Sequence, residues 1–336
     1  MIEFIFTLDY EIYGNGQGNL KECITCPADG LLGLFNKFGY RLVIFPEVLE
    51  LEKIMEYKTD PDISRIGSQL RKIHKEGHEI GLHVHSWWAR AYYQNNRWQF
   101  DLGESNLCSL TGQRIQEILG HGLCFLRNIL NDGSYQPVSF RNGLWTMQPT
   151  RNMAIVLNRL NLRLDSTVFK GGLIKKYGVD YRPSLKNGYY WKFLDDVNRH
   201  QDDGVLLEIP IYTELVPFWK MFSRFLTKTS IRSDQNDSQK WRKEIRNSWS
   251  RAKDYMRLWY PRKLDFCFMS SKEIISLFRK ILELDKKTKE LYKPIVLVGH
   301  TKNLLDLKKV EIILRFIKES GIEITTFKRA LDRIFL

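Results

Sequence analysis

The sequence predicts an α/β fold, namely a distorted and incomplete (β/α) barrel with parallel strands and a basic helical insertion. Short apolar segments alternate with amphipathic segments along almost the whole chain, as expected for strand–helix units around a parallel sheet. The chain has 336 residues, of which 43% are hydrophobic, and this is enough to bury one large core. No Pro/Ser-rich linker or repeat divides it, so we expect a single domain over 1–336.

The N-terminal segments predict two strands and a helix. The apolar runs 2–8 and 40–45 predict buried strands, because continuous apolar runs are typical of strands covered on both faces. A helix is expected between them, over 29–37. The glycine-rich stretch 13–18 fits neither a dinucleotide-binding nor a P-loop spacing, so we interpret it as a flexible active-site loop.

The remaining elements continue this alternation. In 62–76, apolar side chains recur at helical spacing until Gly77 ends the helix. Further helices are predicted over 112–131, 149–160, 271–284 and 306–319, and further strands over 79–84, 137–140, 162–165, 206–211, 294–298 and 322–326.

Composition limits the partners and the compartment. The formal net charge of +13 favours anionic partners such as nucleic acid, phosphorylated sugars or an anionic membrane face. No nucleic-acid-binding motif is present, so we expect no nucleic-acid partner. The five cysteines are an odd and scattered set, and neither a membrane-spanning run nor a signal peptide is evident, so we expect a cytoplasmic protein.

The segment 218–260 differs from the rest of the chain in charge. It carries eleven basic and four acidic side chains, and Trp241, Trp249 and Trp259 lie on an apolar stripe at helical spacing. We interpret it as a helix–loop–helix insertion. Either the Trp stripe packs on the barrel and the basic face is solvated, or the segment makes a peripheral contact with the inner face of a membrane, where a lipid-linked sugar would be presented.

Histidine placement gives the clearest chemical signal. His83 and His85 stand two apart at the end of a predicted strand, so strand alternation puts both imidazoles on one face. Such a pair suits zinc or its neighbours when a carboxylate completes the set. Two satisfied polar histidines near the surface would give the same pattern.

Three more groups of polar residues stand at predicted strand ends. Asp9 and Glu11 point the same way, and a metal with a basic partner would stabilise these like charges. Arg141 can orient a carboxylate through its planar guanidinium, and His300 is suited to general acid catalysis. Each alone has an ordinary surface or loop interpretation, but all stand at the strand edge where (β/α) folds place active sites.

Taken in order, these motifs resemble the polysaccharide deacetylase (NodB-homology) superfamily over nearly the whole chain apart from 218–260. The motifs are Asp-x-Glu from Asp9, His-x-His from His83, Phe-Arg-x-Gly around Arg141 and Gly-His-x-Lys around His300. The resemblance implies a distorted (β/α) barrel that hydrolyses N- or O-acyl groups on sugars with a bound divalent metal. It also implies that Asp9 is the catalytic base, that Arg141 orients it, and that His300 is the acid.

The metal ligands implied by the resemblance depart from the common family pattern. Glu11 and His83 match two ligands directly. The common second histidine stands four residues after the first, where this chain has Trp87, so His85 has to substitute for it. A branch of the superfamily has the corresponding Leu-His-x-His-x-x-Trp motif.

We therefore expect a metal-dependent hydrolase that removes an acetyl or formyl group from an amino sugar of a glycan or glycolipid precursor. Zinc is the expected metal, with cobalt or nickel as alternatives. Tyr10, through its backbone N–H, together with Trp87 and Trp145, is expected to contact the substrate. The other hypothesis, which Trp87 motivates, is a catalytically inactive glycan-binding protein on the same fold.

Overall fold

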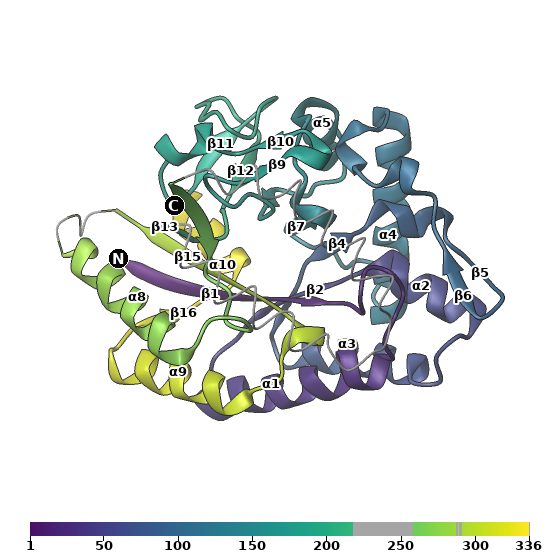
Figure 1. Cartoon of the computed structure of the whole chain (residues 1–336), viewed down its shortest axis with the longest axis horizontal. Helices are drawn as coiled ribbons and strands as arrows, with labels where there is room; N and C mark the ends of the chain where they lie inside the picture. Colours follow the sequence, from purple (N-terminus) through teal and green to yellow (C-terminus); the bar gives the residue numbers. More distant parts are fainter. Residues whose placement is uncertain (218–257, 287, 289–290, 336) are drawn as a thin grey trace.

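The computed structural model describes residues 1–217, 258–286, 288 and 291–335 (Figure 1). Most of the predicted insertion 218–260 therefore lies outside the described residues. The described strands on either side of it, β13 (Thr213–Pro217) and β14 (Trp259–Lys263), pair antiparallel. No helix in the described ranges is long and apolar enough to span a bilayer.

Two sheets form the wall of the barrel. The first has the order β15–β1–β2–β3, with β16 also paired to β1, and all of its pairs are parallel. The second has the order β11–β12–β8–β7–β4 and is parallel except for the pair of β11 with β12. The first sheet contains β1 (Ile2–Tyr10), β2 (Val43–Pro46), β3 (Glu79–Ile80), β15 (Lys293–His300) and β16 (Glu323–Ile324). The second contains β4 (Leu82–Val84), β7 (Ser139–Asn142), β8 (Leu164–Asp165), β11 (Trp191–Phe193) and β12 (Leu206–Glu208).

Isolated bridges join the two sheets. Glu47 pairs with His83 on one side, and Ile211 pairs with Val296 of β15 on the other. The two sheets are thus joined by single bridges and not by continuous ladders, so the strands form no continuously hydrogen-bonded barrel in the described residues. The predicted distorted (β/α) barrel with parallel strands is confirmed.

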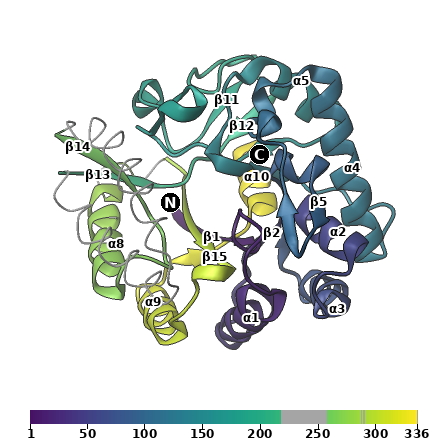
Figure 2. The same ribbon diagram turned by 45° about the vertical axis from the view of Figure 1, so that its right-hand side comes forward.

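Helices surround the strands on the outside (Figure 2). They are α1 (Cys26–Phe38), α2 (Val48–Tyr57), α3 (Ile63–Lys75), α4 (Gly112–Leu130), α5 (Thr150–Arg159), α8 (Ser271–Asp285) and α9 (Leu307–Glu319). Capping residues in the local sequence determine where two of these helices begin. Thr111 caps α4 through its side chain, and Ser270 with Glu273 forms a capping box at α8. Their inner faces pack on the strands, as where the rings of Phe35 of α1 and Phe6 of β1 meet edge to face.

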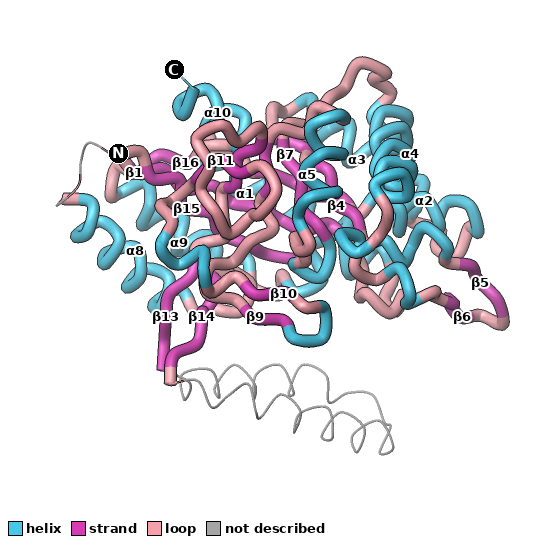
Figure 3. Tube along the Cα trace, turned by 90° about the horizontal axis from the view of Figure 1, so that it is seen from above, coloured by secondary structure: helices cyan, strands magenta, loops and turns pink. Residues whose placement is uncertain are grey.

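The last helix, α10 (Phe327–Phe335), lies at the end of the barrel where the strands begin. The backbone N–H of Lys328 donates to Glu79 at the start of β3, and the Phe327 ring lies against Phe45. The hairpins of β5 (Tyr92–Gln94) with β6 (Arg97–Gln99), of β9 (Leu173–Ile174) with β10 (Val179–Asp180), and of β13 with β14 project on the opposite side of the molecule (Figure 3).

The predicted elements differ from the observed ones mainly at their ends. α1 begins at Cys26 and not at residue 29, because a π-helical turn, Lys21–Thr25, leads directly into it. The strand predicted over 40–45 is observed as β2, and the strand predicted over 79–84 is divided into β3 and β4 at Gly81. α2, α10 and the three hairpins were not predicted.

Candidate active site

Asp9 and Arg141 form a buried ion pair at the C-terminal ends of β1 and β7. Arg141 Nη1 donates to Asp9 Oδ1 at 2.6 Å, and both side chains are almost fully enclosed. The guanidinium also donates from Nε to the carbonyl oxygen of Ser166 at 3.0 Å. Burial opposes ionisation, but the charges of Arg141, His300 and His83 hold the pKa of Asp9 below its ordinary value.

Glu11 stands between two histidines at the ends of β1 and β4. Its Oε2 lies 2.9 Å from Nε2 of His85 and 3.5 Å from Nε2 of His83. The three ligand atoms lie within 4.8 Å of one another. Burial raises the pKa of Glu11, but the stronger combined effect of Lys302 and the two histidines holds it well below its ordinary value.

The surroundings of each histidine leave Nε2 directed at Glu11. His83 Nδ1 lies 2.8 Å from the carbonyl oxygen of Arg141, which can only accept, so Nδ1 carries the proton and Nε2 presents a lone pair. The His85 ring lies against Gly143, where an added Cβ would meet Nδ1 at 2.5 Å, and against the edge of Trp87. Any residue other than glycine at 143 would displace this ring.

His300, the last residue of β15, and Lys302, two residues beyond it, complete the cluster. His300 Nε2 lies 3.4 Å from Asp9 Oδ2, the carboxylate oxygen that does not bond Arg141. Lys302 Nζ donates to Glu11 Oε1 at 2.8 Å and to the carbonyl oxygen of Ile12 at 2.9 Å. Burial lowers the pKa of His300, against the opposing effect of Asp9 and Glu11.

The donor set fits a divalent metal. A carboxylate and two imidazoles on rigid strand ends are the ligand types that zinc and its neighbours take, and three protein ligands leave a position for water. Among the described residues, Nε2 of His83 is buried without a hydrogen-bond partner, and Glu11 Oε2 faces both rings. The ion pair of Glu11 with Lys302 uses the other carboxylate oxygen, Oε1.

Comparison with known proteins gives matches in structure alone. No protein-family model matches the sequence, and no curated protein resembles it significantly. A protein assigned as a polysaccharide deacetylase from Mycobacterium smegmatis aligns with a TM-score of 0.55 and 14% identity, over 99% of this chain and 89% of that chain. The chain has the polysaccharide deacetylase fold.

Two other solved structures share this fold. Puue allantoinase aligns with a TM-score of 0.51 and 12% identity, over 98% of this chain and 88% of that chain. A GH57-type branching enzyme from Pyrococcus horikoshii aligns with a TM-score of 0.57 and 12% identity, over 98% of this chain and 70% of that chain. Because these proteins differ in activity, the polysaccharide deacetylase fold does not by itself choose a reaction, and the function has to be argued from the site.

Of the residues expected to contact substrate, only Trp145 offers its side chain to the cluster. It lies in a turn where Leu144 and Trp145 both have positive φ, 56° and 59°, a rare conformation for bulky residues. Its ring meets His300 at a right angle, with centroids 5.9 Å apart. The amino group of Lys263 lies over the same ring, 3.7 Å from the centroid.

The side chains of Tyr10 and Trp87 are both buried. The Tyr10 side chain is buried on the other face of β1, where its hydroxyl donates to Gln69 at 2.6 Å, so only its backbone can reach a substrate. Trp87 is also buried, and its ring supports His85. The role of the Tyr10 backbone N–H stays a prediction.

Three charged residues of the site were not predicted from the sequence. Lys302 belongs to the Gly-His-x-Lys motif, and its position two residues after His300 is the signal that could have placed it on the same side. Glu47 and Glu50 follow β2, where charge directly after an apolar run is a weaker signal of the same kind. Burial, and after it the charge of Glu11, raises the pKa of Glu50 to about 8, and burial raises the pKa of Glu47 well above its ordinary value.

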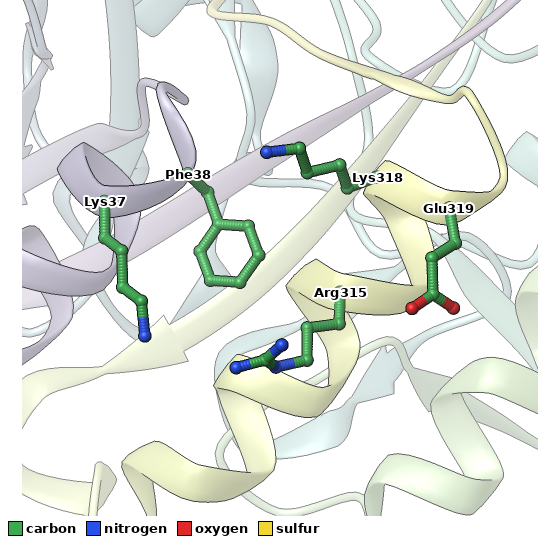
Figure 4. Close-up of a pocket in the computed structure, with 5 residues that line it drawn as sticks. All are labelled: Lys37, Phe38, Arg315, Lys318 and Glu319. Atoms are coloured by element: carbon green, nitrogen blue, oxygen red, sulfur yellow. The ribbon is translucent and has the colours of Figure 1, made fainter.

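A surface pocket between α1 and α9 takes no part in this site (Figure 4). It has a volume of about 260 Å³. It is lined by Lys37, Phe38, Arg315, Lys318 and Glu319. None of these belongs to the cluster at the strand ends, so the chemistry lies elsewhere.

Proposed function

We propose that this protein is a metal-dependent hydrolase that removes an acetyl or formyl group from the nitrogen of an amino sugar. One observation carries the proposal: a buried Asp–Arg ion pair stands beside a histidine and beside three residues that could hold a metal. These residues are Asp9, Arg141, Glu11, His83, His85 and His300. Carbohydrate deacetylation is also the activity named for the assigned relative from Mycobacterium smegmatis.

The chemistry divides among these residues. A divalent metal held by Glu11, His83 and His85, most simply zinc, would lower the pKa of a bound water and polarise the acyl carbonyl. Asp9 accepts the proton of the attacking water through Oδ2, because Oδ1 is bonded to Arg141. Arg141 keeps this carboxylate ionised and fixes its orientation.

Collapse of the tetrahedral intermediate requires a proton for the leaving amine. His300 in its protonated, imidazolium form is the proposed donor, because its Nε2 lies beside the reacting group, 3.4 Å from Asp9 Oδ2. The groups that take and give the proton thus stand next to each other. The backbone N–H of Tyr10 is the proposed second contact to the oxyanion.

The substrate is proposed to be a glycan or a glycolipid precursor. Trp145, beside His300, is the aromatic surface on which a sugar ring would stack. Leu258 and Trp259 are 74% and 57% exposed next to the basic segment 218–257, which supports a lipid-linked substrate presented at a membrane. Liposome flotation of the protein with and without 218–257 tests this contact, and equal binding would contradict it.

A catalytically inactive glycan-binding protein is the second candidate. The ion pair of Lys302 with Glu11 favours it, because the ammonium group partly supplies the positive charge that a metal would bring. The intact set of Asp9, Arg141 and His300 favours the hydrolase, because binding alone requires none of these buried charges.

Replacement of Asp9 by Asn tests the proposed base. Asn keeps the size and a hydrogen bond to Arg141 but accepts no proton, so turnover should fall by about 10²–10⁴-fold with the metal retained. The measurement is amine release from N-acetyl and N-formyl amino sugars, with metal content determined on the same samples. Substantial activity in Asp9→Asn would exclude Asp9 as the base.

A further inference from the structure

Two buried glutamates at the start of α2 join the backbone segments that carry the candidate metal ligands. Glu47 Oε1 accepts the backbone N–H of His85 at 2.7 Å. Glu50 Oε1 accepts the backbone N–H of Ile12, the neighbour of Glu11, also at 2.7 Å. The other carboxylate oxygen of Glu47 accepts the N–H of Glu50. One helical turn is therefore bonded to both the segment after β1 and the segment after β4.

Helix capping alone does not account for these side chains. Glu47 is the N-cap of α2, a position that Ser, Thr, Asp or Asn fills well with a short side chain. Glu47 and Glu50 are almost fully buried, and burying a carboxyl group is costly unless its oxygens are bonded. The longer Glu side chain lets one carboxylate cap the helix and reach His85 as well.

His85 depends on such an acceptor because it lies beyond the end of its strand. β4 ends at Val84, and the His85 backbone has extended angles, φ −105° and ψ 103°, just before a 3₁₀ turn. Without Glu47, its N–H would be left unbonded in a largely buried place. The bond fixes the backbone from which the ring extends, with Nε2 2.9 Å from Glu11 Oε2.

The main chain of Glu47 is held to the same two strands. Its N–H donates to the carbonyl oxygen of Tyr10 at 3.1 Å, and it forms an isolated parallel bridge with His83. Glu47 thus contacts β1 and β4 through its backbone, and the residue directly after β4 through its side chain. A shift of this residue would move the ligands on the two strands relative to each other.

We propose that Glu47 and Glu50 are positioning residues that set the distance between Glu11 and His85 and thereby the affinity of the metal site. This inference rests on the proposed metal site but adds two residues that bind neither metal nor substrate. Outer groups that orient ligands typically change metal affinity by about 10–100-fold when they are removed.

The test compares zinc and cobalt affinity in full-length variants. Glu47→Ala and Glu50→Ala should each raise the metal dissociation constant by about 10–100-fold. Glu50→Gln should restore affinity close to wild type, because its amide oxygen can still accept the Ile12 N–H. Glu47→Gln should still bind metal weakly. Both side-chain oxygens of Glu47 accept backbone N–H groups, and Gln has only one acceptor oxygen.

Glu79 offers a matched control. It is another glutamate with a burial-raised pKa that accepts a backbone N–H, from Lys328 at 2.8 Å, at the opposite end of the barrel. Glu79→Ala should lower the melting temperature and leave metal affinity unchanged. The visible spectrum of bound cobalt, which reports ligand geometry, should change in Glu47→Gln and stay unchanged in Glu79→Ala.

The outcomes separate this inference from the proposed function. If wild type binds neither zinc nor cobalt, the metal site itself is wrong. If wild type binds metal and the folded Glu47→Gln and Glu50→Ala variants bind it equally well, the positioning role is wrong. If the alanine variants do not fold, Glu47→Gln against Glu50→Gln still decides, since equal affinity of these two would contradict the proposal.

Discussion

Arg141 links Asp9, the proposed base, to the proposed metal site. Arg141 Nη1 lies 2.6 Å from Asp9 Oδ1, and the backbone carbonyl of the same arginine fixes Nδ1 of His83 at 2.8 Å. One residue of β7 thus orients the base through its side chain and a metal ligand through its main chain. A change of the side chain should therefore act on the base and leave the ligand in place.

Replacement of Arg141 by Met should destabilise the fold by about 3–5 kcal/mol, because Asp9 is left as an uncompensated buried charge. Urea denaturation of the metal-free protein measures this loss. Asp9→Asn in the Arg141→Met background should restore part of the lost unfolding free energy, because it removes the unpaired buried charge. As a control, Arg315→Met removes a pair with Glu311 from an arginine that is 59% exposed and should cost less than about 1 kcal/mol. Equal losses for the two arginines would contradict the prediction.

His85→Ala and Trp87→Phe separate a ligand from its support. His85 Nε2 faces Glu11, so His85→Ala should remove stoichiometric zinc. The Trp87 ring lies at the edge of His85, 4.3 Å between centroids, so Trp87→Phe should keep the metal with at most a modest loss of affinity. Elemental analysis of protein purified without a histidine tag measures both. Retention of zinc in His85→Ala would exclude the His-x-His site.

The cluster was predictable from the sequence because each residue stands at the end of its own strand. Parallel strands bring these ends to one edge, so Asp9, His83, Arg141 and His300 were expected to meet although they are far apart in the chain. Strand alternation predicted a common direction for Asp9 and Glu11, and for His83 and His85. The contact of Lys302 with Glu11 could not be predicted in this way, because alternation gives a side and not a partner.

Other features depend on contacts that a single sequence does not specify. The Tyr10 hydroxyl finds its partner in Gln69 of α3, a residue distant in the chain, and alternation does not name that partner. The roles of Glu47 and Glu50 depend on backbone N–H groups that lie outside the ladders, and no residue pattern marks such groups. α2 was not predicted because it starts directly after β2 without a loop, so the apolar run continues across the boundary.

Lys302→Met should separate the two candidate functions. Lys302 Nζ bonds Glu11 Oε1 at 2.8 Å, so its removal leaves Glu11 beside Asp9 without a balancing cation and should lower the melting temperature of the metal-free protein. A hydrolase should be stabilised by zinc in both forms, and more in the variant, because the metal then replaces a missing charge. Zinc stabilisation that is present in Lys302→Met and absent in wild type would favour the inactive binding protein.

His78 should make stability fall at mildly acidic pH, independently of the active site. Its side chain is buried, and its Nδ1 accepts the backbone N–H of Leu42 at 3.2 Å. Burial, with a further contribution from Arg41 and against the opposing charge of Glu76, lowers the pKa of His78 from 6.5 to about 4. Between these values the unfolded chain binds a proton that the folded protein does not, so stability is complete above about pH 6.5 and falls as the pH decreases toward 4.

Replacement of His78 by Asn isolates this effect, because the Asn side-chain oxygen can accept the Leu42 N–H but does not titrate in this range. The full pKa shift corresponds to about 3 kcal/mol, and with solvent screening near Arg41 and Glu76 we expect wild type to lose about 2 kcal/mol more than His78→Asn between pH 7 and pH 4. Urea unfolding at closely spaced pH values measures both proteins. Parallel pH profiles would mean that His78 takes up its proton in the folded state as readily as in the unfolded chain.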